Sequence, residues 1–311
     1  MYDEQKAAAF IYRNARPLDL ARYWYHFEQG GAEKVLSILA YYQNTDGGFG
    51  YGLEPDFWNP GSTPIATWAA VKILRETQTF DQEHPLTAGV LRYLASGVYF
   101  NGGYWFNTVP ENDDYPHAVW WRATEDYDRR KSENPTVSLA AFFLRSAAKT
   151  HPFYRRAAEI LAECVADYLN MDPVTPVESH VLNCFVEAYE DLVAIGGIAG
   201  VNLRAFSEKL KKDCLRAVEK DPSRWGVEYV PRPSNFVKGR ESLLYADLQQ
   251  LVSIEAEWIR QQQDKAGVWP ITWSWWTDYP QEEAISKRIW QAYLAIDNLL
   301  FLRNFNDTVK Q

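Results

Sequence analysis

The sequence predicts an all-α protein, and two observations support this class. Apolar residues recur every three or four positions in segments 32–43, 157–169 and 203–218, which is the period of an amphipathic helix. No segment shows the alternating apolar and polar residues around an Asn-Gly turn that predict a β-hairpin. We therefore expect helices throughout the chain.

A common start defines four of the expected helices. Proline is favoured at the first helical position, and a capping side chain often precedes it. The four starts are Thr63-Pro64, Asn134-Pro135, Thr175-Pro176 and Tyr279-Pro280. The prolines lie 71, 41 and 104 residues apart, which fits one or two copies of a unit of roughly 50 residues. The first ten residues after Pro64 and after Pro135 are apolar nearly all round, so we expect these helices to be buried on several sides.

Glycine and aromatic residues share two loops of similar sequence. "QNTDGGFG" covers residues 43–50, and "QQDKAGVW" covers residues 262–269. The matching positions are Gln43 with Gln263, Gly47 with Gly267, and Phe49 with Trp269. Segments 100–106 and 221–226 look like degenerate relatives. A helix pair repeated with such loops predicts a helical array, either open or closed on itself.

These two loops resemble the QW-type repeats of squalene and hopene cyclases and of protein prenyltransferase β-subunits. In that superfamily such loops link the outer and inner helices of an α/α toroid. The resemblance implies one toroid domain over residues 1–311, with inner and outer rings of about ten to twelve helices in all. It also implies that Gln43 and Phe49 tie the loop to a neighbour, while the glycines allow tight turns.

The charge of the chain limits its partners. The net charge is −9 and the pI is near 5.2, which argues against nucleic acid, because phosphate binding needs a basic surface. No polybasic cluster, signal peptide or long apolar run is present, so we expect a cytoplasmic protein with no membrane insertion. Cys164, Cys184 and Cys214 lie in helical apolar patterns and are expected to be buried free thiols.

Acidic loop residues are the candidates for catalysis. If the four prolines begin inner helices, the positive ends of those helices share one rim and favour carboxylates there. Acids among aromatic rings can stabilise a carbocation or an oxocarbenium ion, and a loop histidine can act as acid or base. The predicted catalytic residues are Glu54, Asp56, Asp113, Asp114 and His117. Helix capping is the alternative role for each of these acids.

The resemblance also supplies signatures that can be compared with the chain. Class II terpene cyclases use DxDD, and the nearest string is "ENDD" at residues 111–114, with Glu in the first position. The DDxxD metal motif is replaced by "DDYPH", and no cysteine has the spacing of the prenyltransferase zinc ligands. We therefore assign no metal ligand and no cofactor, and the sequence leaves open whether a divalent metal is needed.

A further set of residues is predicted to bind the substrate. Aromatic rings close to the acidic loops can line a pocket, and a polar stripe with helical spacing follows Pro176. The predicted substrate-binding residues are Trp58, Trp105, Trp120, Trp121, His180, Glu187, Trp273, Trp276 and Asp278. The alternative is that the rings fill the core and the stripe faces solvent.

Three functions remain open from the sequence, and all use a small ligand. The resemblance implies an enzyme related to cyclases or prenyltransferases, acting on a small or isoprenoid-like ligand in an acidic aromatic pocket. The alternatives are a carbohydrate-active glycosidase, epimerase or lyase, and a non-catalytic binding protein. A deep apolar cavity would favour the first, paired acids around a polar floor the second, and a rim sealed by tryptophans the third. The sequence leaves the oligomeric state open.

Overall fold

The computed structural model describes residues 2–305, and these residues form two compact units. Of these residues, unit 1 comprises 2–38, 214–274 and 278–305, and unit 2 comprises 39–213 and 275–277. Twelve α-helices and no β-strand occur within residues 2–305, which confirms the all-α prediction. The helix packing within each unit agrees with an α/α toroid.

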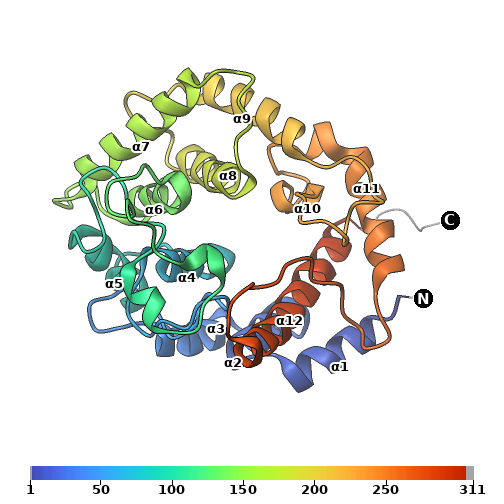
Figure 1. Cartoon of the computed structure of the whole chain (residues 1–311). Helices are drawn as coiled ribbons and strands as arrows, with labels where there is room; N and C mark the ends of the chain where they lie inside the picture. Colours follow the sequence, from blue (N-terminus) through green and yellow to red (C-terminus); the bar gives the residue numbers. More distant parts are fainter. Residues whose placement is uncertain (1, 306–311) are drawn as a thin grey trace. The chain divides into compact units, whose positions relative to one another are not determined.

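Unit 2 contains two layers of helices. Figure 1 shows α4, α6 and α8 side by side in one layer, and α5, α7 and α9 in the other. The central helix is α6, which packs against α4, α5, α7 and α8. The helix bounds are α4 Pro64–Glu76, α5 Pro85–Ala95, α6 Glu133–Ser146, α7 Tyr154–Asn170, α8 Ser179–Ala194 and α9 Leu203–Ala217, the last of which ends in unit 1.

The sequence of α6 explains its central place. Residues 135–144 of this helix are all buried, as expected for a helix that is apolar nearly all round. Three 3₁₀ helices belong to the loops of unit 2. They are η1 Ala40–Tyr42, η2 Pro110–Asp114 and η3 Val119–Trp121.

Unit 1 is organised around its longest helix. α12 packs against α1, α2 and α11, and α10 packs against α11. The bounds are α1 Glu4–Asn14, α2 Pro17–Phe27, α3 Ala32–Leu39, α10 Pro233–Phe236, α11 Tyr245–Gln262 and α12 Pro280–Asn304. No helix within residues 2–305 combines the length and the apolar character needed to cross a membrane.

The proline starts are correct for three helices and wrong for one. Pro64 begins α4, where the Thr63 hydroxyl accepts a hydrogen bond from the Ala66 N–H, and Pro280 begins α12. In α6 the residue before Pro135 has non-helical angles, so the regular helix begins at the proline.

Helix α8 begins three residues after the predicted Pro176. Its N-cap is Glu178, whose carboxylate accepts hydrogen bonds from the N–H groups of His180 and Val181. Thr175 instead belongs to a turn closed by its N–H on the Asp172 carbonyl. A carboxylate close to the first N–H groups of a helix satisfies them and also suits the positive end of its dipole. This cap replaces the Thr-Pro start that the sequence suggested.

The two glutamine loops have the same hydrogen bonds, one loop in each unit. In the first, Gln43 Nε2 donates to the Gly47 carbonyl at 3.0 Å and to the Leu86 carbonyl at 3.1 Å. In the second, Gln263 Nε2 donates to the Gly267 carbonyl at 3.1 Å and to the Asp3 carbonyl at 3.0 Å. Each amide therefore closes its own turn and joins that turn to the start of another helix, α5 or α1.

The backbone of the two turns also matches. The N–H of Asn44 donates to the Gly48 carbonyl, and that of Asp264 donates to the Val268 carbonyl, both at 2.8 Å. The central glycines have φ values of +96° and +94°. The repeat predicted from the letters is thus present as one geometry in both units.

Gly47 is needed for close approach as well as for its backbone angle. A Cβ atom at this position would lie 2.1 Å from the Gly89 carbonyl oxygen, a distance that only a backbone shift could relieve. Gly97 also has a positive φ, +82°, but has open space around the position of a Cβ atom. Comparing Gly47 with Gly97 therefore separates the free-energy cost of a positive φ from that of the close contact with Gly89.

We expect Gly47→Ala to lower the free energy of unfolding far more than Gly97→Ala. Both substitutions place alanine at positive φ, which costs roughly 1–2 kcal/mol, and only Gly47→Ala adds a backbone clash. Urea unfolding of the two variants and the parent protein measures the difference. Equal losses in the two variants would show that the α5 contact does not constrain the turn.

All three cysteines are free and buried, as predicted. Burial, reinforced by the nearby Glu133 carboxylate, raises the pKa of Cys164 to about 12, and burial raises the pKa of Cys184 well above its usual value. Both groups are therefore thiols rather than thiolates near neutral pH, and thiolates are the reactive form.

Native protein should react slowly with a thiol reagent at pH 8, whereas all three cysteines should react rapidly in denaturant. The reason is that reaction requires both exposure and loss of the proton. Stopped-flow absorbance with an aromatic disulfide reagent measures both rates. Rapid labelling of Cys184 in the native state would contradict the buried environment described here.

Candidate functional site

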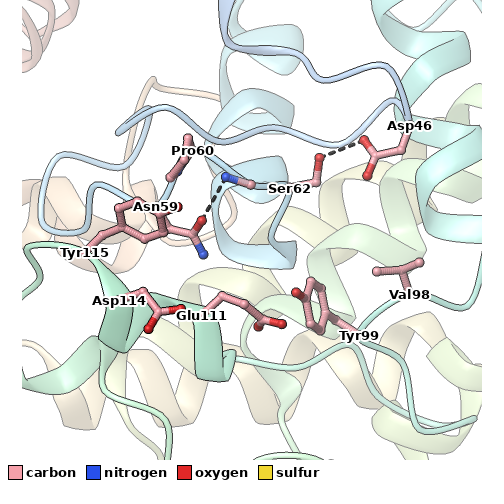
Figure 2. A pocket seen from close by; sticks show the side chains of 10 residues that line it. Asp46, Asn59, Pro60, Ser62, Val98, Tyr99, Glu111, Asp114 and Tyr115 are labelled. Atoms are coloured by element: carbon pink, nitrogen blue, oxygen red, sulfur yellow. Dashed lines mark hydrogen bonds between the residues drawn. The ribbon is translucent and has the colours of Figure 1, made fainter.

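The candidate site is a polar pocket of about 380 Å³ in unit 2. Figure 2 shows loop residues Asn59, Pro60 and Ser62 on one side and η2 residues on the other. Its volume lies within the range of roughly 300–1,000 Å³ that is usual for small-molecule sites. The lining residues are Asp46, Asn59, Pro60, Gly61, Ser62, Val98, Tyr99, Glu111, Asp114 and Tyr115.

Hydrogen bonds fix the loop side of the pocket. Asp46 Oδ1 accepts from the Ser62 hydroxyl at 2.7 Å and from the Gly48 N–H at 2.9 Å. Asn59 Oδ1 accepts from the Gly61 N–H, while its Nδ2 donates to Asn112 Oδ1 at 3.1 Å. Asn59 and Asn112 are buried, so this amide pair joins the loop wall to η2.

The opposite side presents two carboxylates from one short helix. Glu111 and Asp114 are three residues apart in η2, and residues i and i+3 of a 3₁₀ helix lie on one face, about 6 Å apart along the axis. Both are exposed and line the pocket. Carboxylates accept hydrogen bonds from hydroxyl groups and are the acid and base residues of most glycoside hydrolases.

Tyr99 stands beside the first of these acids. Burial, and after it the hydrogen bond to the Glu111 carboxylate, raises the pKa of Tyr99 well above its usual range. The phenol therefore stays protonated across the physiological range. Tyr99 also has a φ of +49°, an uncommon angle for a bulky side chain.

Strained aromatic residues are concentrated in the loops of this region. Five non-glycine residues between 2 and 305 have positive φ, and Gln29 and Gln78 follow the ends of α2 and α4. The other three are aromatic: Tyr51, Tyr99 and Trp276. Such angles cost of order 1–3 kcal/mol each and are typical of functional sites.

The predicted catalytic residue Asp56 is buried beside the pocket rather than lining it. Its side chain is 4% exposed, and Oδ1 accepts a hydrogen bond of 2.7 Å from the indole Nε1 of Trp275. Its backbone carbonyl accepts from the Ala118 N–H. Glu54 accepts from the Asp56 N–H at 2.7 Å, so the two acids hold a turn. Glu54 thus has the capping role given above as the alternative, and Asp56 in addition binds the distant Trp275.

His117 lies near the predicted acids, as the sequence suggested. Its backbone pairs with Phe57, and its Nε2 is 3.5 Å from Asp113 Oδ1. Its Nδ1 is 2.7 Å from the Tyr115 carbonyl. The imidazole is only 2% exposed, so it organises the loop behind Tyr115.

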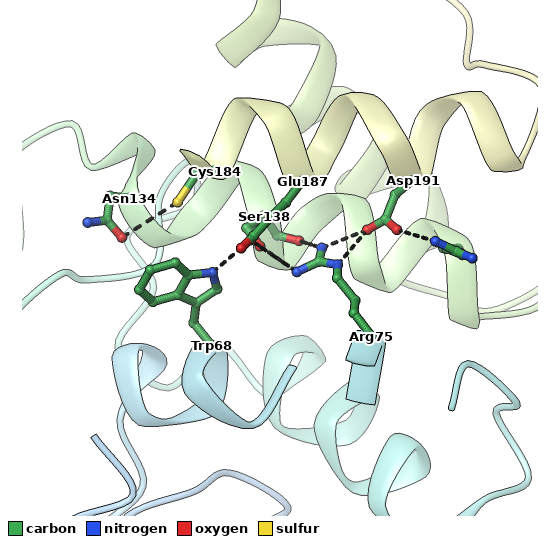
Figure 3. Close-up of polar contacts among 8 residues, drawn as sticks. Trp68, Arg75, Asn134, Ser138, Cys184, Glu187 and Asp191 are labelled. Atoms are coloured by element: carbon green, nitrogen blue, oxygen red, sulfur yellow. Dashed lines mark hydrogen bonds and ion pairs between the residues drawn. The ribbon is translucent and has the colours of Figure 1, made fainter. Parts of the chain in front are cut away.

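Of the second predicted set, His180 and Glu187, the glutamate belongs to a separate polar cluster. Glu187 Oε2 accepts hydrogen bonds from Trp68 Nε1, Ser138 Oγ and Arg75 Nη1, at 3.0, 2.5 and 3.2 Å. Figure 3 shows that these groups come from α4, α6 and α8 and converge between the helices. Because this one oxygen accepts hydrogen bonds from α4 and α6, Glu187 of α8 links the three helices.

Asp191 extends the cluster by one helical turn. It is 1% exposed and accepts from Arg75 Nη2 at 2.6 Å and from Arg145 Nη1 at 2.8 Å. Burial by itself would lower the pKa of Arg75, but the Asp191 and Glu187 carboxylates more than offset this and raise it. His180 lies about three turns before Asp191 on α8, where burial lowers its pKa, so the imidazole is neutral near pH 7.

The predicted tryptophans occupy different environments. Trp105 is fully buried against Phe100 and Phe153, and Trp121 is 9% exposed. Trp58 is half-buried, and its Nε1 donates to the Pro55 carbonyl. The exposed rings are those of Trp120 and Trp276.

Two predicted residues belong to unit 1. Trp273 packs edge-on against Tyr229 and Trp290, and Asp278 is exposed just before α12. Their proposed contact with a substrate stays a prediction.

Most residues that line the pocket were not predicted from the sequence. Asp114 was predicted, but Asp46, Asn59, Ser62, Tyr99 and Tyr115 were not chosen as site residues. Asp46 and Asn59 lie in or next to the glycine-rich segment, so that segment was a usable signal. Nothing in the sequence indicated Tyr99, which follows α5 and pairs with Glu111 through the fold.

No family model, curated protein or solved structure matches this chain in comparisons of its sequence and structure. Among the described residues, no group of three or more His, Cys, Asp or Glu side chains is arranged to hold a metal ion. The pocket and its lining residues are therefore the observations that bear on function.

We expect Asp56→Ala to lower the free energy of unfolding by about 1–3 kcal/mol, because it leaves the buried Trp275 N–H without its acceptor. Asp56→Asn keeps an oxygen at the same position and should cost less than half as much. Chemical denaturation of both variants measures the two losses. Equal losses would show that the carboxylate charge, rather than the hydrogen bond to Trp275, is what the fold requires.

Proposed function

We propose that the protein is a carbohydrate-active protein that binds a sugar in the acidic pocket of unit 2. The observation that carries this proposal is the pairing of Glu111 and Asp114 on one face of η2, opposite the polar groups of Asn59 and Ser62. Sugar hydroxyls both donate and accept hydrogen bonds, so they suit a wall of carboxylates, an amide, a hydroxyl and phenols.

The same pair can support acid–base chemistry on a glycosidic bond. One carboxylic acid would give its proton to the leaving oxygen, while the other carboxylate takes a proton from the attacking water. Glu111 and Asp114 line the same pocket, so either carboxyl group could take either role. Both side chains are exposed to an open pocket that water can enter.

The alternative from the resemblance is an isoprenoid ligand. The two matching glutamine turns support kinship with the cyclase and prenyltransferase fold, but one fold carries many chemistries. An isoprenoid chain needs a continuous apolar wall, whereas Val98 and Pro60 are the aliphatic side chains of this pocket. The lining therefore favours the sugar.

Titration calorimetry with a panel of neutral mono- and oligosaccharides tests the proposal. We expect Glu111→Gln and Asp114→Asn to weaken sugar binding about tenfold or more, since a hydrogen bond to a charged group contributes about 1.5–3 kcal/mol. Their melting temperatures should stay near that of the parent, because both side chains are exposed.

Glu125→Gln provides the matched control, because Glu125 is an exposed loop acid that does not line the pocket. This variant should bind sugars as the parent does. Tight binding of farnesyl diphosphate or of spermidine, with no binding of any sugar, would overturn the proposal in favour of an apolar or a cationic ligand.

A further inference from the structure

Two indole rings of unit 2 are exposed to solvent and contact each other edge to face. Trp120 and Trp276 are 36% and 73% exposed, and their ring centroids lie 6.2 Å apart at an interplanar angle of 81°. Tryptophan is highly buried on average, so a pair on the surface calls for a reason. Trp120 belongs to η3 and Trp276 to segment 275–277, and both are part of unit 2.

The backbone of Trp276 is strained. Its φ is +51°, an outlier for a bulky residue, and such strain persists only where the surroundings determine it. The preceding residue, Trp275, is 1% exposed and donates its indole N–H to Asp56. The Trp275 carbonyl accepts from the Val119 N–H at 3.1 Å. These two contacts anchor the segment while the next ring is directed outward.

The indole pair is joined to the pocket through its wall. Asn112 Nδ2 donates to the carbonyl of Trp121, the neighbour of Trp120, and Asn112 Oδ1 accepts from the pocket residue Asn59. Tyr115, which lines the pocket, precedes Trp120 by five residues on the same loop. Hydrogen bonds through Asn112 thus connect the pocket wall to the residue next to Trp120.

The chemistry of this surface fits one kind of occupant. Two rings at right angles give a small apolar corner, much smaller than the roughly 800 Å² per partner of a stable protein interface. Asp113, Asp114 and Tyr115, which precede Trp120 by five to seven residues, are also exposed. A sugar ring has an apolar C–H face that packs on an indole and hydroxyl edges that bind carboxylates. Alternating rings and acids thus suit a chain of sugar units.

We propose that Trp120 and Trp276 form a stacking subsite for a second sugar unit of an oligosaccharide whose first unit occupies the acidic pocket. This inference rests on the proposed function, since it extends the same ligand beyond the pocket. With this subsite, the protein binds oligosaccharides more tightly than single sugars, because the indole pair contacts the second sugar unit.

Calorimetry with glucose and N-acetylglucosamine, and with cellotriose, maltotriose and chitotriose, tests the subsite. For at least one sugar type, the parent protein should bind the trisaccharide about tenfold more tightly than the monosaccharide. Trp276→Ala should remove that advantage and leave monosaccharide binding unchanged. Tyr41→Ala, which removes an aromatic ring that is 83% exposed elsewhere in unit 2, should keep it.

The outcomes separate the two proposals. Equal affinities for monosaccharide and trisaccharide, or an unchanged trisaccharide affinity in Trp276→Ala, would overturn the subsite and leave the proposed function standing. Binding of no sugar of either length would overturn the proposed function and the subsite together. A trisaccharide-dependent change in tryptophan fluorescence that is lost in Trp276→Ala would support stacking on this ring.

Discussion

The side-chain amides of Gln43 and Gln263 make the interaction on which the rest of the structure depends. An amide N–H₂ group has two donors, and in each unit one donor closes the glycine turn while the other reaches a carbonyl at the start of a different helix. Local and long-range order are therefore formed by the same group. An alanine in its place would leave two partly buried carbonyls to find other donors.

The pocket follows from the first of these turns. Beyond Gly47 the chain runs through Gly50, where a Cβ atom would lie 2.3 Å from the carbonyl oxygens of Pro60 and Gly61. The absence of a side chain at Gly50 lets segment 59–62 lie against the turn, and Asp46 then holds Ser62 in place. The glycines thus serve the architecture first and, through it, the wall of the candidate site.

Local features of the fold were readable from the sequence, and distant contacts were not. Thr63-Pro64 predicted the start of α4 because a cap and its N–H groups lie within one turn. The same rule failed at Pro176, where Glu178 is the better acceptor for the first N–H groups of α8. The spacing of Gln43 and Gly47 was visible in both loops because the turn itself is local.

The site was only partly predictable for the same reason. Asp114 and the loop around it could be chosen by composition, but the burial of Asp56 depends on Trp275, which is 219 residues away. Tyr99 was missed because its partner Glu111 and its unusual φ arise from the fold. Sequence reasoning located the acidic loops, and the structure decided which acids line the pocket and which support it.

The charged cluster between α4, α6 and α8 constrains how this chain can diverge. Arg75 and Arg145 form ion pairs with Glu187 and Asp191 between these helices. Replacing one member leaves an uncompensated charge away from water, which typically costs about 3–5 kcal/mol, whereas a well-packed apolar set can replace the whole group at little cost. The four residues are therefore expected to be kept or replaced together. Descendants should keep the four residues together or exchange them in concerted steps, and a lineage that has lost one of them should show a compensating change on a facing helix.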